Sequence, residues 1–458
     1  MKNHFSILAR LLLAALALAP LTGHAVPSFA RQTGLSCIDC HTEFSDLNTL
    51  GRQFKLSGYT IGGGQSNLPP LAFMTQPSFT HTAKGQPGGA APGFNDNNNF
   101  ADTQTSVFYA GRLFGPYADK LFGKDGANIA NKIGIFSQVT YDGVAKKWHW
   151  DSQELRYADT GAIAGRSVTY GVYLNNNPTM QDPWNSTPAW GFPFSTTGLP
   201  AQQPSSPMID GALAQQVAGF GAYAFVDKSF YFDAAAYHTL GAQFQRSMGI
   251  DPTGQTQVSD LAPYWRAAYV KTSGNTSIEV GTFGLAADTF PGRDRSAGQD
   301  HTLDVGLDAQ VQTAFGANDL TGTVSWIYER NTWDASQTLT SATNHTDNLK
   351  ELKVTADYLY DKTYGVDVQF FAVEGSDDAA LYPNSASGSP GSDGVVFQLA
   401  WLPFNKNGGP SFLPLSNLKL SIQYTLYDRI NGAHSNYDGL GHNASDNNTL
   451  YLQAWIAF

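Results

Sequence analysis

The sequence predicts an all-β protein: a transmembrane β-barrel of the outer-membrane type, with about sixteen antiparallel strands and a small α-helical unit at its N-terminus. From residue 71 onward, apolar and polar side chains alternate with a period of two, in runs of about ten residues or more. Aromatic residues crowd the ends of these runs, as membrane-interface girdles require. Short turns also alternate with long loops, which is typical of bacterial barrels.

The first 25 residues predict a cleaved secretory signal peptide. Lys2 and Arg10 form its basic start, Leu11–Leu21 its apolar run and Gly23–Ala25 a cleavage site of small residues. The apolar run is too short to span a bilayer, so we leave residues 1–25 out of the fold prediction. The signal directs the chain out of the cytoplasm, and the barrel pattern places it in the outer membrane.

Composition supports a barrel and excludes one class of partner. Charged residues make up only 14% of the chain, where roughly a quarter is usual for a soluble protein. No segment after the signal approaches the ~20 consecutive apolar residues of a spanning helix. The formal net charge of −11 argues against nucleic acid as a partner. Outer-membrane lipid is the surface that the barrel is expected to contact.

Residues 26–68 predict a small unit separate from the barrel of residues 69–458. Apolar residues recur at roughly helical spacing after residue 46, which predicts a short helix there. Glycines at 58 and 62–64 end that helix, and Asn67–Pro70 marks the hinge into the barrel. About forty residues cannot bury much core alone, so we expect a bound apolar group to supply it.

The strand pattern is clearest at 418–427, 303–312, 351–360 and 450–458. In the first of these runs, one face carries Leu418, Leu420, Ile422, Tyr424 and Leu426. The other face carries polar residues such as Lys419 and Gln423, which we expect to line the lumen. Long loops are predicted near 176–212, 286–299, 335–347 and 376–392. The loop that begins at residue 176 is rich in proline and aromatic residues, so we expect it to be ordered and to fold into or over the pore.

Cys37-Ile-Asp-Cys40-His41 contains the only two cysteines of the chain. C-x-x-C-H is the attachment sequence of c-type haem, in which two sulfurs bond to the porphyrin edge and the following imidazole binds the iron. A thioredoxin-like redox pair would need a βαβ context, which is absent. A structural zinc site would need a second pair of ligands at compact spacing. The sequence therefore predicts one covalently bound c-type haem.

The second axial ligand of the iron is predicted from strand register. In the strand after residue 70, Met74 alternates with apolar residues, so it points into the lumen if the apolar face meets lipid. A thioether ligand raises the haem potential. His81 at the end of the same strand is the second candidate, and a position that is open or occupied by water is the third.

Three cations flank the haem segment: Arg31, Arg52 and Lys55. Arginine suits the carboxylates of haem propionates, so these residues either bind the propionates or form a positive face towards solvent or the lumen. Other charged residues in the lumen phase, including Arg266, Asp308 and Lys419, are predicted to line the pore. No hydrolase motif is present.

The segment Phe29–Cys37 through His41, followed by Leu47–Asn48 and Leu50–Tyr59, resembles the start of a known family. This family is the fused outer-membrane monohaem cytochrome c–porin, the iron-oxidising outer-membrane cytochrome c. The resemblance implies a haem plug within a porin of about sixteen strands. It also implies that electrons pass from extracellular Fe(II) to a periplasmic c-type cytochrome or a similar carrier, an Fe(II) oxidase activity. Cys37, Cys40 and His41 match the family's haem-binding positions.

Two other functions remain open at this point. One is a diffusion porin whose haem unit is a stopper or sensor, in which case solutes would still pass. The other is an outward electron conduit, in which the haem passes electrons to an extracellular acceptor. Sequence leaves the donor, the direction of flow, the periplasmic partner and the oligomeric state open.

Overall fold

The computed structural model describes residues 27–43, 46–62, 68–200, 202–412 and 416–458. The predicted signal peptide lies outside these residues. Within them, no helix is long and apolar enough to cross a membrane.

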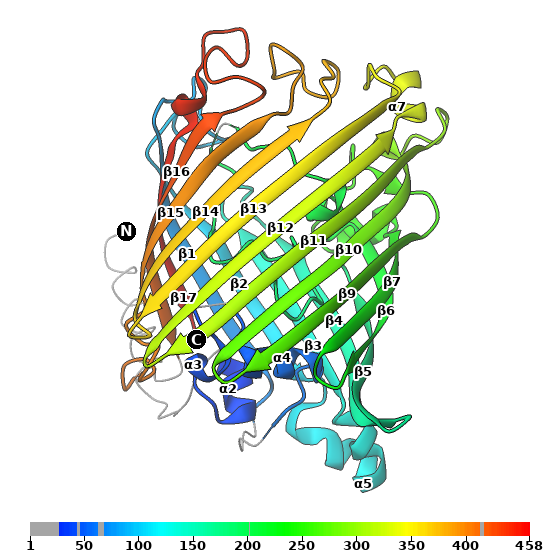
Figure 1. Cartoon of the computed structure of the whole chain (residues 1–458), viewed down its shortest axis with the longest axis vertical. Coiled ribbons are helices and arrows are strands. Elements are labelled where there is room, and N and C mark those ends of the chain that lie inside the picture. The colour runs from blue at the N-terminus through cyan, green and yellow to red at the C-terminus, as the bar shows by residue number, and fades with distance from the viewer. Residues whose placement is uncertain (1–26, 44–45, 63–67, 201, 413–415) are drawn as a thin grey trace, which may run out of the picture.

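Antiparallel strands close into one barrel, as predicted (Figure 1). The sheet has 17 strands, but β8 (Gln257–Val258) is a two-residue strand that pairs with β10, so sixteen long strands form the wall. Each long strand pairs with the next, and β1 pairs with both β2 and β17 to close the sheet. The long strands are β1 (Leu71–Thr82), β2 (Asn99–Arg112), β3 (Ile133–Asp142), β4 (Lys147–Ile163), β5 (Arg166–Asn175), β6 (Val217–Val226), β7 (Phe230–Thr239), β9 (Ala262–Ser273), β10 (Thr276–Phe290), β11 (Asp300–Phe315), β12 (Asn318–Thr332), β13 (Thr346–Tyr360), β14 (Tyr364–Gly375), β15 (Ser392–Trp401), β16 (Asn417–Arg429) and β17 (Thr449–Ala457).

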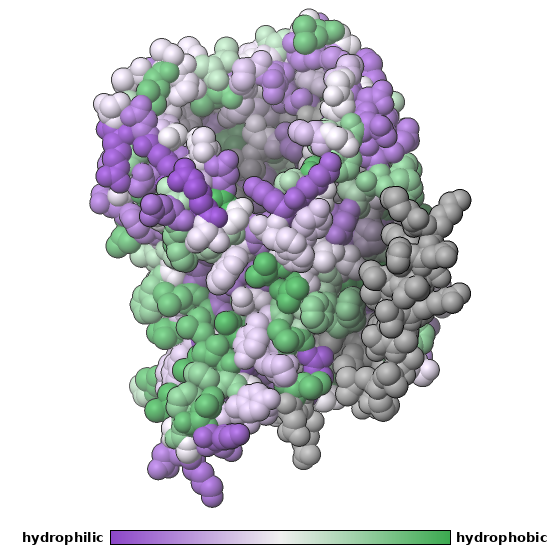
Figure 2. Space-filling view, turned by 180° about the vertical axis from the view of Figure 1, so that it is seen from behind, coloured by the Kyte–Doolittle hydropathy of each residue, from purple (hydrophilic) through white to green (hydrophobic). Residues whose placement is uncertain are grey.

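The wall is apolar outside and polar inside. On β16, Ile422 is 55% exposed on the outer face, whereas Lys419 is 1% exposed and points inward. On β11, Leu307 is 52% exposed and Asp304 is fully buried. Apolar residues gather over the middle and lower wall, and hydrophilic residues over the upper rim (Figure 2). A closed barrel with an apolar outer surface is an outer-membrane protein, which confirms the predicted location.

The two ends of the barrel differ in their connections. At one end, called here the turn end, strands are joined by short turns such as 227–229, 274–275 and 316–317. At the other, the loop end, longer segments carry α6 (Ala242–Ser247), α7 (Asp334–Thr338) and the short helices η3 (Pro291–Arg293) and η4 (Ala444–Asn447). Short turns face the periplasm in bacterial barrels. The C-terminus lies at the turn end (Figure 1).

One turn-end connection is a helix that the sequence pattern did not predict. η1 (Gly115–Tyr117) and α5 (Ala118–Ala130) join β2 to β3 and project below the barrel (Figure 1). Gly123 has a φ of 67°, which kinks α5 in its middle. The kink interrupts the helical periodicity on which sequence recognition depends.

The described residues of 27–62, called here the N-terminal segment, form three short helices at the turn end. These are α2 (Pro27–Thr33), α3 (Cys37–Cys40) and α4 (Thr49–Leu56), the last being the predicted helix. The segment contacts lumen-facing side chains from several sides of the wall. Glu43 pairs with Lys419 of β16 at 2.6 Å, and Tyr223 of β6 donates to the carbonyl of Leu56. The segment therefore crosses the lumen.

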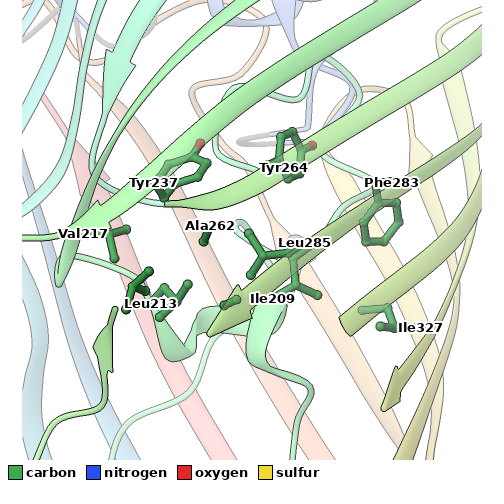
Figure 3. Close-up of a cluster of buried hydrophobic side chains, with 11 residues drawn as sticks. Ile209, Leu213, Val217, Tyr237, Ala262, Tyr264, Phe283, Leu285 and Ile327 are labelled. Atoms are coloured by element: carbon green, nitrogen blue, oxygen red, sulfur yellow. The ribbon is translucent and has the colours of Figure 1, made fainter. Parts of the chain in front are cut away.

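The connection between β5 and β6 folds into the lumen from the loop end. Its described residues, 176–200 and 202–216, are called here the inner loop. Lys419 donates to the carbonyl of Pro193 at 3.1 Å, and Arg266 pairs with Asp182 at 2.8 Å. Ile209 and Leu213, which belong to the inner loop and its π-helix η2 (Met208–Ala212), pack against buried side chains of β6, β7, β9, β10 and β12 (Figure 3). The prediction of an ordered, inward-folded loop is confirmed.

Candidate functional site

A single helical turn presents the two cysteines and the histidine that follows them. The side chain of Asp39 accepts from the Ser36 amide and hydroxyl, both at 2.7 Å, and fixes the start of α3. The His41 amide closes the turn by donating to the carbonyl of Cys37 at 2.9 Å. Residues three apart lie on one face of a helical turn, so Cys37 and Cys40 point the same way.

The imidazole of His41 is oriented by a backbone contact. Its Nδ1 lies 3.2 Å from the carbonyl oxygen of Asp46. A carbonyl can only accept, so Nδ1 carries the proton and Nε2 carries the lone pair. This arrangement, in which one ring nitrogen donates to a carbonyl and the other binds, is usual for iron- and zinc-ligating histidines.

Asn48 and Gly51 join this turn to α4. The Asn48 side chain accepts from the amides of Leu50 and Gly51 at 2.9 and 3.1 Å, and it donates to the carbonyl of Asp39 at 2.9 Å. At Gly51, a Cβ atom would lie 2.2 Å from the carbonyl oxygen of Cys40, so only glycine allows this approach. The Cys37–His41 turn is therefore held tightly against the start of α4.

The motif opens on an apolar cavity of about 410 Å³. Its walls come from the N-terminal segment, from strands β1, β2, β3, β4 and β17, and from the inner loop. Aromatic and apolar side chains dominate the lining, among them Phe29, Phe54, Tyr59, Phe108, Phe136, Trp190, Phe192 and Trp455. This volume and lining are typical of cofactor sites, with a few polar groups placed against an apolar wall.

The structure brings the predicted haem residues to this one cavity. Cys37, Cys40, His41 and Met74 all line it. Met74 is 7% exposed and points into the lumen, so the register prediction for β1 is confirmed. Of the cavity's described lining residues, Met74 is the only methionine and His41 the only histidine. His81 lies at the far end of β1, where its Nδ1 is 2.9 Å from the side chain of Asn98, and does not line the cavity.

The three flanking cations were expected either to face the predicted haem or to form a positive face towards solvent or the lumen, and the structure places them differently from one another. Arg52 is 5% exposed and contacts Ser277 and Gln312 of the wall, so it takes the lumen-contacting position and does not line the cavity. Arg31 donates to the carbonyl of Leu71, at the start of β1. Neither arginine lines the cavity, and each guanidinium group donates its hydrogen bonds to residues of the barrel wall.

Lys55 does line the cavity and lies 5.2 Å over the ring of Trp190. Its ammonium group donates to the carbonyl of Asp182 at 2.6 Å and to Asn185 Oδ1 at 2.9 Å. Burial lowers the pKa of Lys55 to about 7, although the nearby carboxylates of Asp182 and Glu154 oppose the shift. Lys55 therefore joins the N-terminal segment to the inner loop.

The donor set fits a haem better than a bare metal ion. Within the described ranges, no group of three or more His, Cys, Asp or Glu side chains is placed to hold an ion. Burial, followed by the charges of Asp39 and Cys37, raises the pKa of Cys40 to about 11, so its sulfur is a neutral thiol near pH 7. Two thiols, one oriented imidazole and one thioether around an apolar space match the chemistry of a covalently held haem.

Sequence reasoning missed the aromatic walls. Trp455, Phe192 and Phe136 come from β17, the inner loop and β3, and only folding brings them together. Along β17, Trp455 shares a face with Gln453, and this alternation was the one available signal. Nothing in the sequence pairs it with Phe192, whose ring centroid lies 6.0 Å away.

No family model and no curated protein matches the chain. Among solved structures, it is similar to an anion-selective porin from Comamonas acidovorans, with a TM-score of 0.45 and 12% identity over 84% of this chain and 98% of that chain. It is also similar to the outer membrane channel DcaP of Acinetobacter baumannii, with a TM-score of 0.44 and 9% identity over 85% and 96%. OmpT of Vibrio cholerae gives a TM-score of 0.41 and 9% identity over the same shares. The closed sheet itself carries the assignment to the β-barrel class.

Proposed function

We propose that this barrel is an outer-membrane electron-transfer protein with a single c-type haem. In this proposal, Cys37 and Cys40 would hold the haem covalently and His41 would bind its iron. Electrons enter from extracellular Fe(II) and leave to a periplasmic carrier, a c-type cytochrome or similar protein. One observation carries the proposal: the C-x-x-C-H turn opens directly on an apolar cavity within a closed barrel.

Each lining residue has a defined part in this function. The Cys37 and Cys40 sulfurs would form the thioether bonds, and His41 would bind through Nε2 because Nδ1 is engaged with Asp46. Met74, which lines the same cavity, would supply a second ligand to the iron. Phe29, Phe192 and Trp455 exclude water, which tunes the potential of a buried haem. When bound, the haem supplies one-electron redox chemistry through its iron.

The position of the cavity supports transfer across the membrane. The N-terminal segment lies at the turn end, which faces the periplasm in bacterial barrels. A periplasmic carrier would therefore dock close to the site. The acidic charge balance favours a cationic donor. The choice of Fe(II) rests on the resemblance of residues 29–59 to the iron-oxidising family.

Covalent attachment is the first test. We expect the full chain, produced with a cytochrome c maturation system, to retain a peroxidase-active band on a denaturing gel. The double variant Cys37→Ser, Cys40→Ser should lose that band completely, whereas Ser36→Ala should keep it. A parent protein without attached haem would refute the proposal.

Reduction by Fe(II) is the second test. Rapid mixing of oxidised, haem-loaded protein with Fe(II) should give the reduced spectrum within seconds. If other donors reduce the haem and Fe(II) does not, then Fe(II) is not the electron donor but the electron-transfer function stands.

Planar-bilayer recording should show little solute conductance, because the N-terminal segment and the inner loop both cross the lumen. A large open-channel conductance would instead support a diffusion porin.

A further inference from the structure

The connection between β2 and β3 exposes large apolar side chains. It spans residues 113–132 and contains η1 and α5, whereas the neighbouring turn-end connections named above have two or three residues. Its buried residues are small: Ala118, Ala127 and Ala130. Its exposed apolar residues are large and are 46–63% exposed: Tyr117, Leu121, Phe122 and Ile129. A helix surrounded by water does the reverse, because the gain from burial grows with apolar area. The exposed face of this connection therefore suits an apolar environment.

The connection begins on the lipid-facing side of the wall. On β2, Phe108 lines the lumen cavity, so the next residue, Tyr109, points outward. The Tyr109 hydroxyl donates to the carbonyl of Leu113 at 2.7 Å. The chain that leads into η1 is therefore held against the outer face of β2.

The connection also ends on the lipid-facing side. Lys132 pairs at 2.6 Å with Asp159 of β4, which points outward because Ala158 is buried in the lumen. Tyr170 of β5 stands opposite Asp159 in the sheet register, and Tyr157 precedes Asp159 by two residues on the same face. Outward-facing tyrosines near strand ends belong to the aromatic girdle at the membrane interface. Both ends of the connection therefore lie at the periplasmic interface, next to lipid.

We propose that η1 and α5 bind the phospholipid surface of the periplasmic leaflet, with Leu121, Phe122 and Ile129 inserted between the headgroups and the upper acyl chains. The lipid-facing surface of the barrel supports this assignment, because apolar surface runs from the lower wall onto this connection at the lower left of Figure 2. The lipid contact is independent of the proposed electron-transfer function, because none of its residues lines the cavity.

The exposed charges of α5 cancel. They are Asp119, Lys120, Lys124 and Asp125. A helix without net charge binds a membrane surface through its apolar side chains, because attraction to anionic lipid contributes little. We therefore expect the contact to persist at high salt, where attraction between exposed charges is screened.

Quenching by spin-labelled lipids tests the contact. Replacing Cys37 and Cys40 by Ser removes both cysteines of the chain, so Leu121→Cys can then carry a single environment-sensitive dye. The mature chain is reconstituted in vesicles of phosphatidylethanolamine and phosphatidylglycerol. A nitroxide near the lipid headgroup should lower the emission about twofold, and more than a nitroxide at the end of the acyl chain, because interfacial helices lie ~5–10 Å deep.

Two variants serve as comparisons. Asn275→Cys places the dye on the exposed turn between β9 and β10, at the same end of the barrel, and should be quenched much less. Adding Phe122→Ser and Ile129→Ser to the Leu121→Cys chain should reduce its quenching to the level of Asn275→Cys. Migration as a folded barrel on unheated gels is required of every variant.

Photocross-linking repeats the test with both cysteines in place. A photoreactive phenylalanine analogue at position 122 should cross-link to phospholipid in outer membranes. Equal quenching of the dyes at positions 121 and 275, or loss of quenching at high salt, would overturn the proposal. Cross-linking of position 122 to a second copy of the chain or to another protein, with no lipid adduct, would assign this surface to a protein partner and would overturn it as well.

Discussion

The two sides of the lumen contain opposite kinds of side chain. Beside β1, β2 and β17, the wall and the inner loop enclose the apolar cavity with rings such as Phe108 and Trp455. Beside β9, β10 and β11, Arg266 pairs with Asp182, Glu279 and Asp308 at 2.8–3.0 Å, and all four side chains are fully buried.

The ionic side supports the apolar side through the inner loop. Asp182 belongs to this loop, so its pair with Arg266 fixes the loop against one wall. Ser186 adds a hydrogen bond to Asp308 of the same network. Further along, Trp190 and Phe192 of the same loop reach the cavity, with ring centroids 5.7 Å apart. The ion-pair network of Arg266 on one wall thus positions the rings of Trp190 and Phe192 over the apolar cavity at the opposite wall.

The largest predicted effect follows from removing the centre of the ionic side. Arg266→Met leaves three buried carboxylates without their cation, which should lower the free energy of unfolding by roughly 3–5 kcal/mol. Denaturant unfolding of the barrel in detergent measures this change. Arg166→Met removes an exposed pair with Asp227, whose side chains are 64% and 38% exposed, and should change stability by less than about 1 kcal/mol. Equal effects would mean that the network is not what holds the loop.

Overpacking tests the apolar side at the Cys37–His41 turn. Gly51→Ala places a methyl group 2.2 Å from the Cys40 carbonyl, so α4 must move away from the cysteines. We expect the free energy of unfolding to fall by roughly 1–3 kcal/mol. In the proposed haem protein, the yield of covalently attached haem should also fall. The haem-to-protein absorbance ratio measures the yield. Gly161→Ala, which meets no atom within 4 Å, should leave both quantities unchanged.

A smaller effect is expected where α3 and α4 are joined. Asn48→Ala removes the N-cap of α4 and the contact with Asp39, at a cost of about 1 kcal/mol. Asn48→Asp keeps the acceptor for Leu50 and Gly51 but not the donor to Asp39. The midpoint temperature of thermal unfolding should therefore be highest for the parent protein, lower for Asn48→Asp and lowest for Asn48→Ala. If Asp is no better than Ala, the link to α3 matters more than the cap.

Met74→Leu should change stability little and act mainly on the spectrum of the proposed haem. Met74→Leu nearly preserves volume in the apolar wall, so its cost should stay below about 1.5 kcal/mol. The same variant should abolish any methionine–iron charge-transfer band in the oxidised spectrum. A band that persists, or a parent spectrum with two histidine ligands, would assign the second axial ligand elsewhere.

The direction of each strand's side chains was predictable because apolar residues that face lipid alternate with polar residues that face the lumen. Leu418 and Ile422 point outward and Lys419 and Gln423 inward, as alternation predicted. The same rule turned Met74 towards the lumen. Local alternation suffices here because every strand separates lipid from a polar interior.

The interior arrangement was not predictable in the same way. Arg52 was expected either at the propionates or on a positive face, and its contact with Gln312 depends on how α4 is rotated within the barrel. Arg266 was predicted to line a pore, but the inner loop covers it and makes it a buried ion-pair centre. Both outcomes follow from contacts between residues far apart in the chain, which periodicity does not encode.

Closure of the wall by β1 and β17 fixes an order of assembly. Cys37 is only 6% exposed once the cylinder is sealed, and the segment that carries it precedes the first strand. A maturation enzyme needs both thiols within reach, so in the proposed haem protein the pigment must be joined to the chain in the periplasm before the last strand docks. Insertion into the membrane would then trap a finished prosthetic group, and a chain that inserted too early would remain colourless.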